Sequence, residues 1–281
     1  MRGLLVAFGL IASCSGAFAG DYELPTLRGS AESLMPTLPT YTIWRGVYAG
    51  GQVGYSSAHS DFGNGVNDLA ASVVRNTVLE PFVVNLNTLP PASSNGASVG
   101  AFVGYNTQWE GVILGFEFNY SHATLTVGSA AAAPGFQVSS NSLAGHHFVY
   151  DVNVSGGETI RVTDLATFRA RAGWIAGQFL PYGFLGLAVA RTDLNRSATV
   201  AWSRRDTPDA GFPDLSGIGG GTAADVQNGG FHFGYAGGIG MDVFVTPTIF
   251  WRGEWEYVVV PDIRGLNFNM NTVRTALGVK F

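Results

Sequence analysis

Apolar and polar residues alternate through many segments of this chain, and this period of two limits the folds open to it. In the last segment, Val273, Leu277 and Phe281 fall on one side of an extended strand, and Arg274 and Lys280 fall on the other. A strand with this pattern has one apolar face and one polar face. Seven earlier segments show the same alternation: about Gly46–His59, Gly96–Trp109, Val112–Thr126, Ile160–Gly177, Tyr182–Ser197, Gly229–Val245 and Thr248–Val260.

The connections between these eight segments alternate in length. Residues 110–111, 178–181 and 246–247 are short, with Gly or Pro turn chemistry. The intervening connections are long, and we expect loops at about Ser60–Asn95, Val127–Thr159, Ala198–Asn228 and Pro261–Asn271. Short periplasmic turns and long outward loops are typical of outer-membrane barrels. The sequence therefore predicts an all-β fold, a transmembrane eight-stranded antiparallel up-and-down β-barrel over residues 44–281, with both chain ends in the periplasm.

The first residues are typical of an export signal. A short positive start and an apolar run lead to Ala17-Phe-Ala19, a small-x-small cleavage site, so we expect a signal peptide at residues 1–19. The segment around Cys14 also fits a lipoprotein cleavage site, which stays open as an alternative. Residues 20–43 contain several prolines and lack periodicity, which predicts a periplasmic N-terminal extension. Cys14 is the only cysteine, so the sequence predicts no disulfide.

Charged residues make up only 12% of the chain, and the formal net charge is −5. A nucleic-acid partner is not expected, because phosphate binding needs a basic surface. Most charges on the predicted strands fall opposite the apolar row, and an eight-stranded barrel is just wide enough for side chains to fill its lumen. We therefore expect an ion-pair network in the lumen, with Glu117 facing Arg169 and Arg171. Its predicted members are Glu117, Arg169, Arg171, Asp242, Arg252, Glu254, Glu256, Arg274 and Lys280.

Aromatic residues near the strand ends fit two interfacial girdles. The predicted girdle residues are Trp44, Trp109, Tyr182, Trp251 and Phe281 at the periplasmic rim and Tyr55, Tyr120 and Tyr257 at the other.

Few residues suggest chemistry. His146 and His147 are candidate haem or metal ligands, although adjacent residues of a strand point to opposite sides, so two solvated loop histidines are the favoured interpretation. The glycine run Gly217–Gly221 is expected to be a flexible loop, because no Lys-Ser/Thr follows it. No catalytic residues, cofactor or metal are predicted. His59, His122 and His232 near the strand tops leave a lipid enzyme at the barrel rim as an alternative.

The chain resembles the porin-like, immunogenic surface-antigen family of eight-stranded outer-membrane proteins of Gram-negative bacteria. The stretches that carry the resemblance are Trp44–Tyr55, Gly104–Trp109, Gly111–Glu117, Ala166–Gly173, Gly183 onward, Gly237–Gly240, Glu254–Tyr257 and Thr272–Phe281. The resemblance implies an outer-membrane location, a surface-antigen role, weak pore activity and no catalytic residues. Some members bind haem. It also implies that Phe281 is the signal read by the barrel-insertion machinery.

We thus expect a non-enzymatic surface protein with a filled lumen. Its expected partners are outer-membrane lipid, the insertion machinery and host or surface ligands. A porin that passes small solutes, or a surface haem- or ligand-binding protein, are the alternatives.

Overall fold

The computed structural model describes residues 43–84, 86, 89–263 and 266–281. The predicted signal peptide lies outside the described residues, as does the predicted N-terminal extension apart from Ile43. The elements, in chain order, are β1 (Gly46–Asp61), α1 (Asn67–Val73), α2 (Glu80–Val83), β2 (Ala92–Trp109), β3 (Val112–Ala132), β4 (Phe136–Ser140), β5 (Phe148–Trp174), β6 (Phe179–Asp206), β7 (Gly217–Phe244), β8 (Ile249–Ile263) and β9 (Leu266–Lys280).

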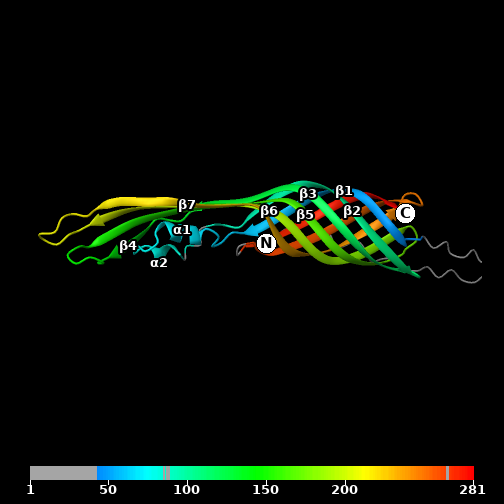
Figure 1. Ribbon diagram of the computed structural model, residues 1–281, viewed down its shortest axis with the longest axis horizontal. Coiled ribbons are helices and arrows are strands. Elements are labelled where there is room, and N and C mark those ends of the chain that lie inside the picture. Colours follow the sequence, from blue (N-terminus) through cyan, green and yellow to red (C-terminus); the bar gives the residue numbers. More distant parts are fainter. Residues whose placement is uncertain (1–42, 85, 87–88, 264–265) are drawn as a thin grey trace, which may run out of the picture. The chain divides into compact units, whose positions relative to one another are not determined.

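Eight of these strands form a closed antiparallel ring (Figure 1). Neighbours in sequence pair with each other, β3 pairs with β5, and β9 pairs with β1 to close the ring. The closing register places Tyr48 opposite Lys280 and Asp61 opposite Asn267. The predicted up-and-down barrel is confirmed, and β4 is an additional short strand outside the ring.

The two faces of the ring follow the period of two. On β9, Val273 and Leu277 are 63% and 61% exposed, whereas Arg274 and Ala276 between them are buried. The same alternation runs along β3, where Phe116 and Phe118 face outward and Glu117 faces inward. The apolar face therefore lies outside the barrel and the polar face lines its interior, which is the arrangement of a membrane barrel.

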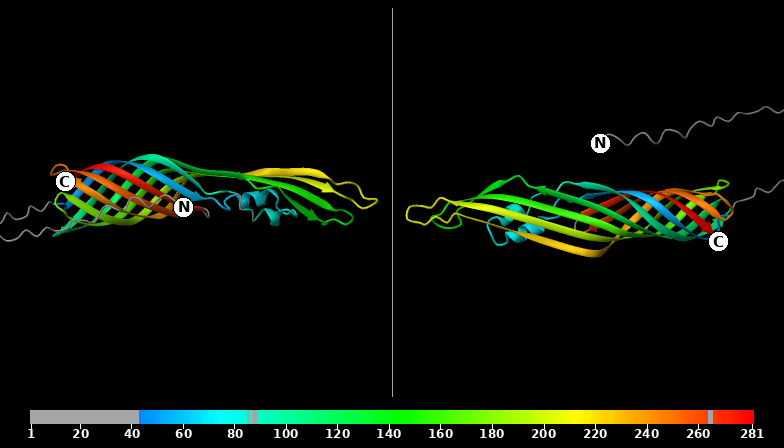
Figure 2. Two further views of the ribbon diagram at one scale, coloured as in Figure 1. Left: turned by 180° about the vertical axis from the view of Figure 1, so that it is seen from behind. Right: turned by 90° about the horizontal axis from the view of Figure 1, so that it is seen from above.

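Three of the predicted long loops, at about Val127–Thr159, Ala198–Asn228 and Pro261–Asn271, are largely extended strand, so their assignment as loops was wrong. The strands of the first two, together with both helices, form a part that we call the extension. It consists of α1, α2, Leu125–Ala132 of β3, β4, Phe148–Val162 of β5, Leu194–Asp206 of β6 and Gly217–Gln227 of β7. Figure 2 shows these strands continuing past the end of the ring. Register shifts in β3, β5 and β6, at His122/Leu125, Val162/Asp164 and Thr192/Leu194, occur where barrel and extension meet. Such β-bulges bend strands at barrel rims.

The first predicted loop instead contains α1 and α2, which the sequence interpretation missed. Val66, Ala70 and Val74 recur every fourth residue and are all buried, so one side of α1 packs against the sheet. Leu79 and Val83 of the α2 region join the same hydrophobic cluster. Among the described residues, neither helix is long and apolar enough to cross a membrane.

Two smaller assignments also change. Pro181 belongs to β6, and the turn before it is shorter than predicted, since Ala176 already bridges to Phe179. The glycine run Gly217–Gly221 is the start of β7 and pairs with β6 between Val200 and Arg204. It is therefore strand and not a flexible loop.

Candidate functional site

The barrel interior is filled in layers, beginning with an aromatic layer at the end of the short turns. Trp44 stacks on Phe244 with ring centroids 3.8 Å apart, and Phe250 packs edge-on against Trp44 at 6.1 Å. Tyr48 and Phe102 complete the layer, 6.1 Å apart. The rings fit because glycines face them: a Cβ on Gly278 would lie 2.2 Å from the Phe250 ring.

A charged layer lies directly above the aromatic one and is built around Glu117. Its carboxylate lies 2.7 Å from Arg252, 3.2 Å from Arg171 and 3.6 Å from Arg169. Arg252 also donates to both oxygens of Asp242, at 2.7 and 3.0 Å, and Arg171 approaches Asp242 at 2.7 Å. These atoms come from β3, β5, β7 and β8, so the ion pairs join strands across the lumen.

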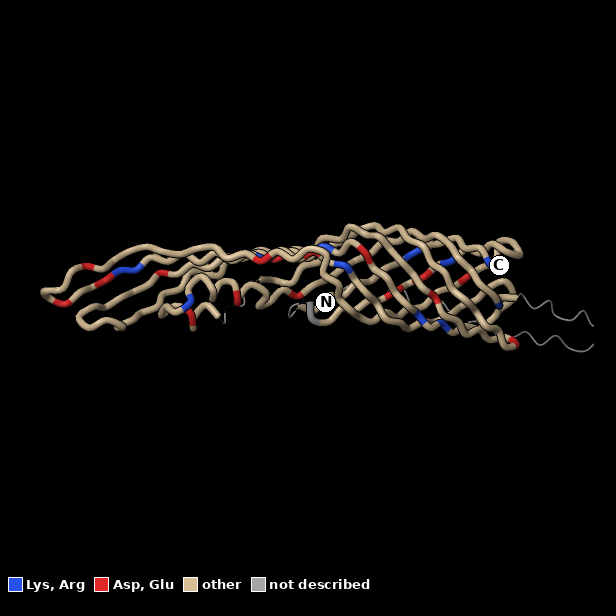
Figure 3. The backbone as a smooth tube through the Cα atoms, viewed as in Figure 1, with Lys and Arg blue, Asp and Glu red and all other residues tan. Residues whose placement is uncertain are grey.

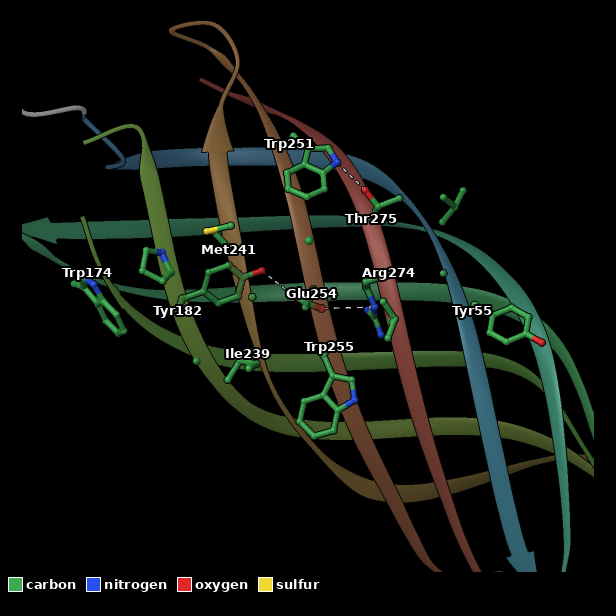
Figure 4. Close-up of a pocket in the computed structure, with 17 residues that line it drawn as sticks. Tyr55, Trp174, Tyr182, Ile239, Met241, Trp251, Glu254, Trp255, Arg274 and Thr275 are labelled. Carbon is green, nitrogen blue, oxygen red and sulfur yellow. Dashed lines mark hydrogen bonds and ion pairs between the residues drawn. The ribbon is translucent and has the colours of Figure 1, made fainter. Parts of the chain in front are cut away.

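A second group of charges continues the layer toward β9. Arg169 lies 2.7 Å from Glu254 and 2.8 Å from Glu256. Arg274 pairs with Glu256 and donates to Asn119 at 3.2 Å. Figure 4 shows Arg274 of the neighbouring strand β9 and Tyr182 of β6 both turned toward Glu254 of β8.

The structure brings eight of the nine predicted lumen residues together, each at most 4% exposed. Figure 3 shows basic and acidic positions interspersed along the barrel strands. With four arginines and four carboxylates, the layer is neutral overall. Such balance is required, because an unpaired charge buried in the lumen would carry a large desolvation cost.

Lys280 is the exception, and its predicted place in the network was wrong. Its ammonium donates to the backbone carbonyl of Ile43 at 2.5 Å and lies 6.0 Å from the Phe244 ring. Lys280 is opposite Tyr48, one layer nearer the turn end than the carboxylates. Its side chain therefore reaches the rim of the barrel rather than the charged layer.

Two tyrosines, Tyr48 of the aromatic layer and Tyr182, extend their hydroxyl groups into the charged layer, where the sequence interpretation did not place them. Tyr48 donates to Glu117 at 2.9 Å, and Tyr182 donates to Glu254 at 2.8 Å. The Arg171 guanidinium lies 3.8 Å from the Tyr182 ring centroid, a close cation–π contact. Tyr182 and Trp44 were predicted for an interfacial girdle, but both are buried in the interior. The period of two identifies Tyr48, which falls opposite the outward Val47 and Val53.

Above the charges, the interior becomes neutral and then apolar. Gln52 exchanges amide hydrogen bonds of 2.9 Å with Asn119 and donates to Ser121 at 2.9 Å. Ser56 and Thr272 hydroxyls bond at 2.8 Å. Beyond them, aliphatic side chains at the barrel top merge with the core of the extension. The interior is thus occupied by side chains through aromatic, ionic, amide and aliphatic layers.

The outer face is apolar beside this filled interior. A hollow of about 1080 Å³ is lined chiefly by outward side chains, including Trp174, Ile239, Met241 and Trp255 (Figure 4). Trp251 fixes one end by donating its indole N–H to Thr275 at 2.8 Å.

The candidate haem residues face different neighbours. His146 is buried, with Nδ1 2.7 Å from Asp206, and its ring stacks against Phe148. His147 is exposed, with Nδ1 3.2 Å from Asn141 and Nε2 3.4 Å from Asp209. Across the described part of the chain, no group of three or more His, Cys, Asp or Glu side chains is arranged to hold a metal ion.

The rim histidines likewise contact different strands. His59 hydrogen-bonds Ser93 at 2.9 Å, and His122 lies 3.0 Å from Asp164, which also accepts from Tyr120 at 2.6 Å. Both histidines lie on the outward surface.

Comparison with known proteins agrees with this architecture. Residues 33–281 match the family model described as outer membrane protein beta-barrel domain. No curated protein matches the chain in sequence. Similar solved structures include Neisserial surface protein A, at 14% identity and a TM-score of 0.34, which covers 84% of this chain and 97% of its own. Ail of Yersinia pestis, solved with the heparin analogue sucrose octasulfate, has 10% identity and a TM-score of 0.32, covering 84% and 99%.

The outer membrane protein OprG of Pseudomonas aeruginosa is a third such structure, at 12% identity and a TM-score of 0.33, covering 84% of this chain and 96% of its own. At these values the likenesses add nothing to the strand pairing already described. The family match extends over most of the sequence, and the closed ring with its apolar outer face has the form that the family name describes. The chain therefore belongs to the outer membrane protein beta-barrel domain family and is an outer-membrane protein.

Proposed function

We propose that this chain is a non-conducting, non-enzymatic membrane anchor that presents the extension outside the cell for contact with other surfaces. The observation that carries the proposal is the neutral charged layer, in which four arginines and four carboxylates pair across the lumen. A porin instead keeps a water-filled channel, which needs a wider barrel.

The orientation follows from the family and the connections. Outer-membrane barrels keep short turns in the periplasm and extend their long connections outward. The turns before β3, β6 and β8 are short, and the extension lies at the opposite end. We infer that the outward apolar side chains, such as Leu185 and Phe233, contact outer-membrane lipid.

Conductance in planar bilayers tests the closed lumen. The wild-type barrel is expected to give no stable channel steps. The double variant Glu117→Ala/Arg252→Ala is the control, because it removes one charge of each sign and leaves Asp242 paired with Arg171. It should keep heat-modifiable folding on a gel and admit ions. Open channels of porin size in the wild type would overturn the proposal.

Thiol labelling tests the orientation. Cys14 is the only cysteine in the sequence, so an introduced thiol can be followed against a simple background. Ser203→Cys lies in the extension, and Thr248→Cys lies at a short turn; both positions are exposed. A membrane-impermeant maleimide should label intact cells at Ser203→Cys and not at Thr248→Cys. The reverse labelling pattern would show that the barrel has the opposite orientation in the membrane.

A further inference from the structure

The extension has one long unpaired edge, on β7. This strand pairs with β6 along nearly its whole length, but with β8 only between Tyr235 and Phe244. Among the described residues, the segment Gly217–Gln227 therefore has a neighbouring strand on one side only. Eleven residues of strand span roughly 36 Å, and an edge of this kind leaves a row of N–H and C=O groups open to another strand.

This edge lacks the usual protection. Natural edges are guarded by Lys, Pro, inward charges or a covering element. Gly217–Gln227 contains no Lys or Pro, and its one charge, Asp225, pairs with Arg196 at 2.8 Å on the side that carries α1. The opposite edge of the extension is different, because Pro134 interrupts it between β3 and β4. Of the two edges, β7 offers the longer uninterrupted stretch for pairing.

On the outer face beside this edge, the exposed side chain of Ile218 stands next to a hollow. A hollow of about 590 Å³ is lined by residues of β5, β6 and β7, among them Asn153, Ala201, Gly220 and Thr222. Ile218 stands at its border and is 87% exposed. α1 packs on the other face, where Val73 approaches Gly221. In an antiparallel pairing of two β7 strands about Gly220, Ile218 of each copy would lie opposite Thr222 of the other and beside its hollow.

The strand direction decides where the second copy lies. Two copies in one membrane run β7 in the same direction. A two-fold axis along the strands would then place N–H groups opposite N–H groups and C=O groups opposite C=O groups, so that no hydrogen bonds form. Copies in two facing membranes run antiparallel, which gives alternating pairs of inter-strand hydrogen bonds. Pairing about Gly220 brings residues 217–223 of the two copies together and supplies about seven such bonds, within the range found in protein interfaces.

We propose that the β7 edges of two copies in facing outer membranes pair antiparallel, each inserting Ile218 into the hollow of the other, so that the chain joins cells to each other. The inference rests on the proposed function, because it requires the extension to lie outside the cell. It names the partner as a second copy of this chain. Many weak pairs between two facing membranes would act together, since the second and later contacts form at high effective concentration.

Charge exchange at the edge tests this pairing. Cells of a Gram-negative host that lacks the protein are made to display wild type, Ile218→Lys/Thr222→Lys or Ile218→Glu/Thr222→Glu at equal surface levels. Wild-type cells should settle together, and each charged variant alone should settle no faster than cells without the protein. Mixing the Lys and Glu populations, each with its own fluorescent label, should restore mixed clusters. Thr126→Lys/Asn195→Lys is the matched control, because it adds the same charge at exposed positions of β3 and β6 that do not line the hollow.

The results separate the two proposals. If wild-type cells do not cluster, or the Lys variant clusters like wild type, edge pairing is wrong, while the maleimide labelling still reports whether the extension is outside. If wild-type cells bind to cells without the protein, the partner is another surface component and not a second copy. If Ser203→Cys is not labelled on intact cells, the proposed function fails first, independently of any clustering.

Discussion

Glu117 is the residue on which the charged layer depends most. Its carboxylate faces three arginines, and all four side chains are buried. Glu117→Gln keeps the size and removes the charge, so three guanidinium groups would share one fewer carboxylate. Removing one partner of a buried pair typically costs about 3–5 kcal/mol. The variant barrel should therefore lose its heat-resistant folded band at a lower temperature than wild type.

The control for this change is Glu110→Gln, which alters the same group at an exposed turn. It should leave the gel transition unchanged. If Glu117→Gln and Glu110→Gln melt together with wild type, the buried network does not stabilise the barrel.

Glu158 gives the extension a dependence on pH. It lies on β5 beyond the bulge at Val162/Asp164, outside the membrane-spanning part, and is 1% exposed, without a hydrogen-bond partner for either oxygen among the described residues. Burial raises the pKa of Glu158 from its ordinary 4.5 to about 7, and the nearby Arg196 only partly offsets this. Between these values the folded state holds a proton that the unfolded state has released, so stability falls as pH rises.

Glu158→Gln removes this titration. The variant and the wild type should be equally protected near pH 4, whereas at pH 8 the variant should protect α1 better. Amide hydrogen exchange, corrected for the intrinsic rate at each pH, measures the difference, and Asp209→Asn at the exposed tip serves as control. Equal exchange in α1 at both pH values would show that Glu158 is not buried as described.

The period of two predicts which side chains enter the lumen but not how far along the axis they lie. The sequence therefore predicts the lumen positions of Glu117 and Arg171, which the structure shows in the network, but it wrongly predicts Lys280 as a member. Height depends on the register between strands, which places Lys280 opposite Tyr48 at the rim. Tyr182 was misplaced for a related reason, because the strand begins at Phe179 and Tyr182 is therefore already inside it.

At the scale of elements, the extension was missed because its strands are rich in Gly, Ser, Thr and Asn, which also mark loops. The alternation nevertheless continues, since Phe148, Tyr150, Val152 and Val154 are all buried. α1 was missed because it is short, although Val66, Ala70 and Val74 follow a helical spacing. The sequence could not predict that α1 packs on the strands of the extension, because the residues of each are buried only by contact with the other.

Docking of α1 on the sheet can be tested at Ala70. Ala70→Asp would place a carboxylate at a position 2% exposed, amid Val66 and Val74. Burying an unpaired charge should cost on the order of 3 kcal/mol and release the helix. Limited proteolysis should then cut within residues 62–84, while the heat-modifiable band of the barrel persists. Ser72→Asp, on the exposed side of the same helix, should resist cleavage like wild type; equal cleavage of both variants would contradict the packing.

At the scale of the whole molecule, closure depends on β9 meeting β1. The ladder runs from Tyr48 opposite Lys280 to Asp61 opposite Asn267, and the Phe281 backbone N–H adds a bond to the Val47 carbonyl at 2.9 Å. The barrel was predictable from sequence because every strand repeats the same period and alternate connections are short. The bulges and the extension follow from pairing across the ring, which no single segment reveals.

The ring of Phe281 is 76% exposed, so the folded barrel gains little packing from it. We therefore propose that Phe281 acts during assembly, as the signal read by the insertion machinery. Phe281→Ala should sharply lower the amount of barrel at the cell surface. The same variant, refolded in detergent, should show the heat-modifiable transition within a few degrees of wild type. Phe231→Ala, another outward phenylalanine at 67% exposure, is the matched control and should reach the surface normally. Normal surface levels for Phe281→Ala would refute the assembly role, and an equal loss of stability in refolded protein would assign the ring to packing instead.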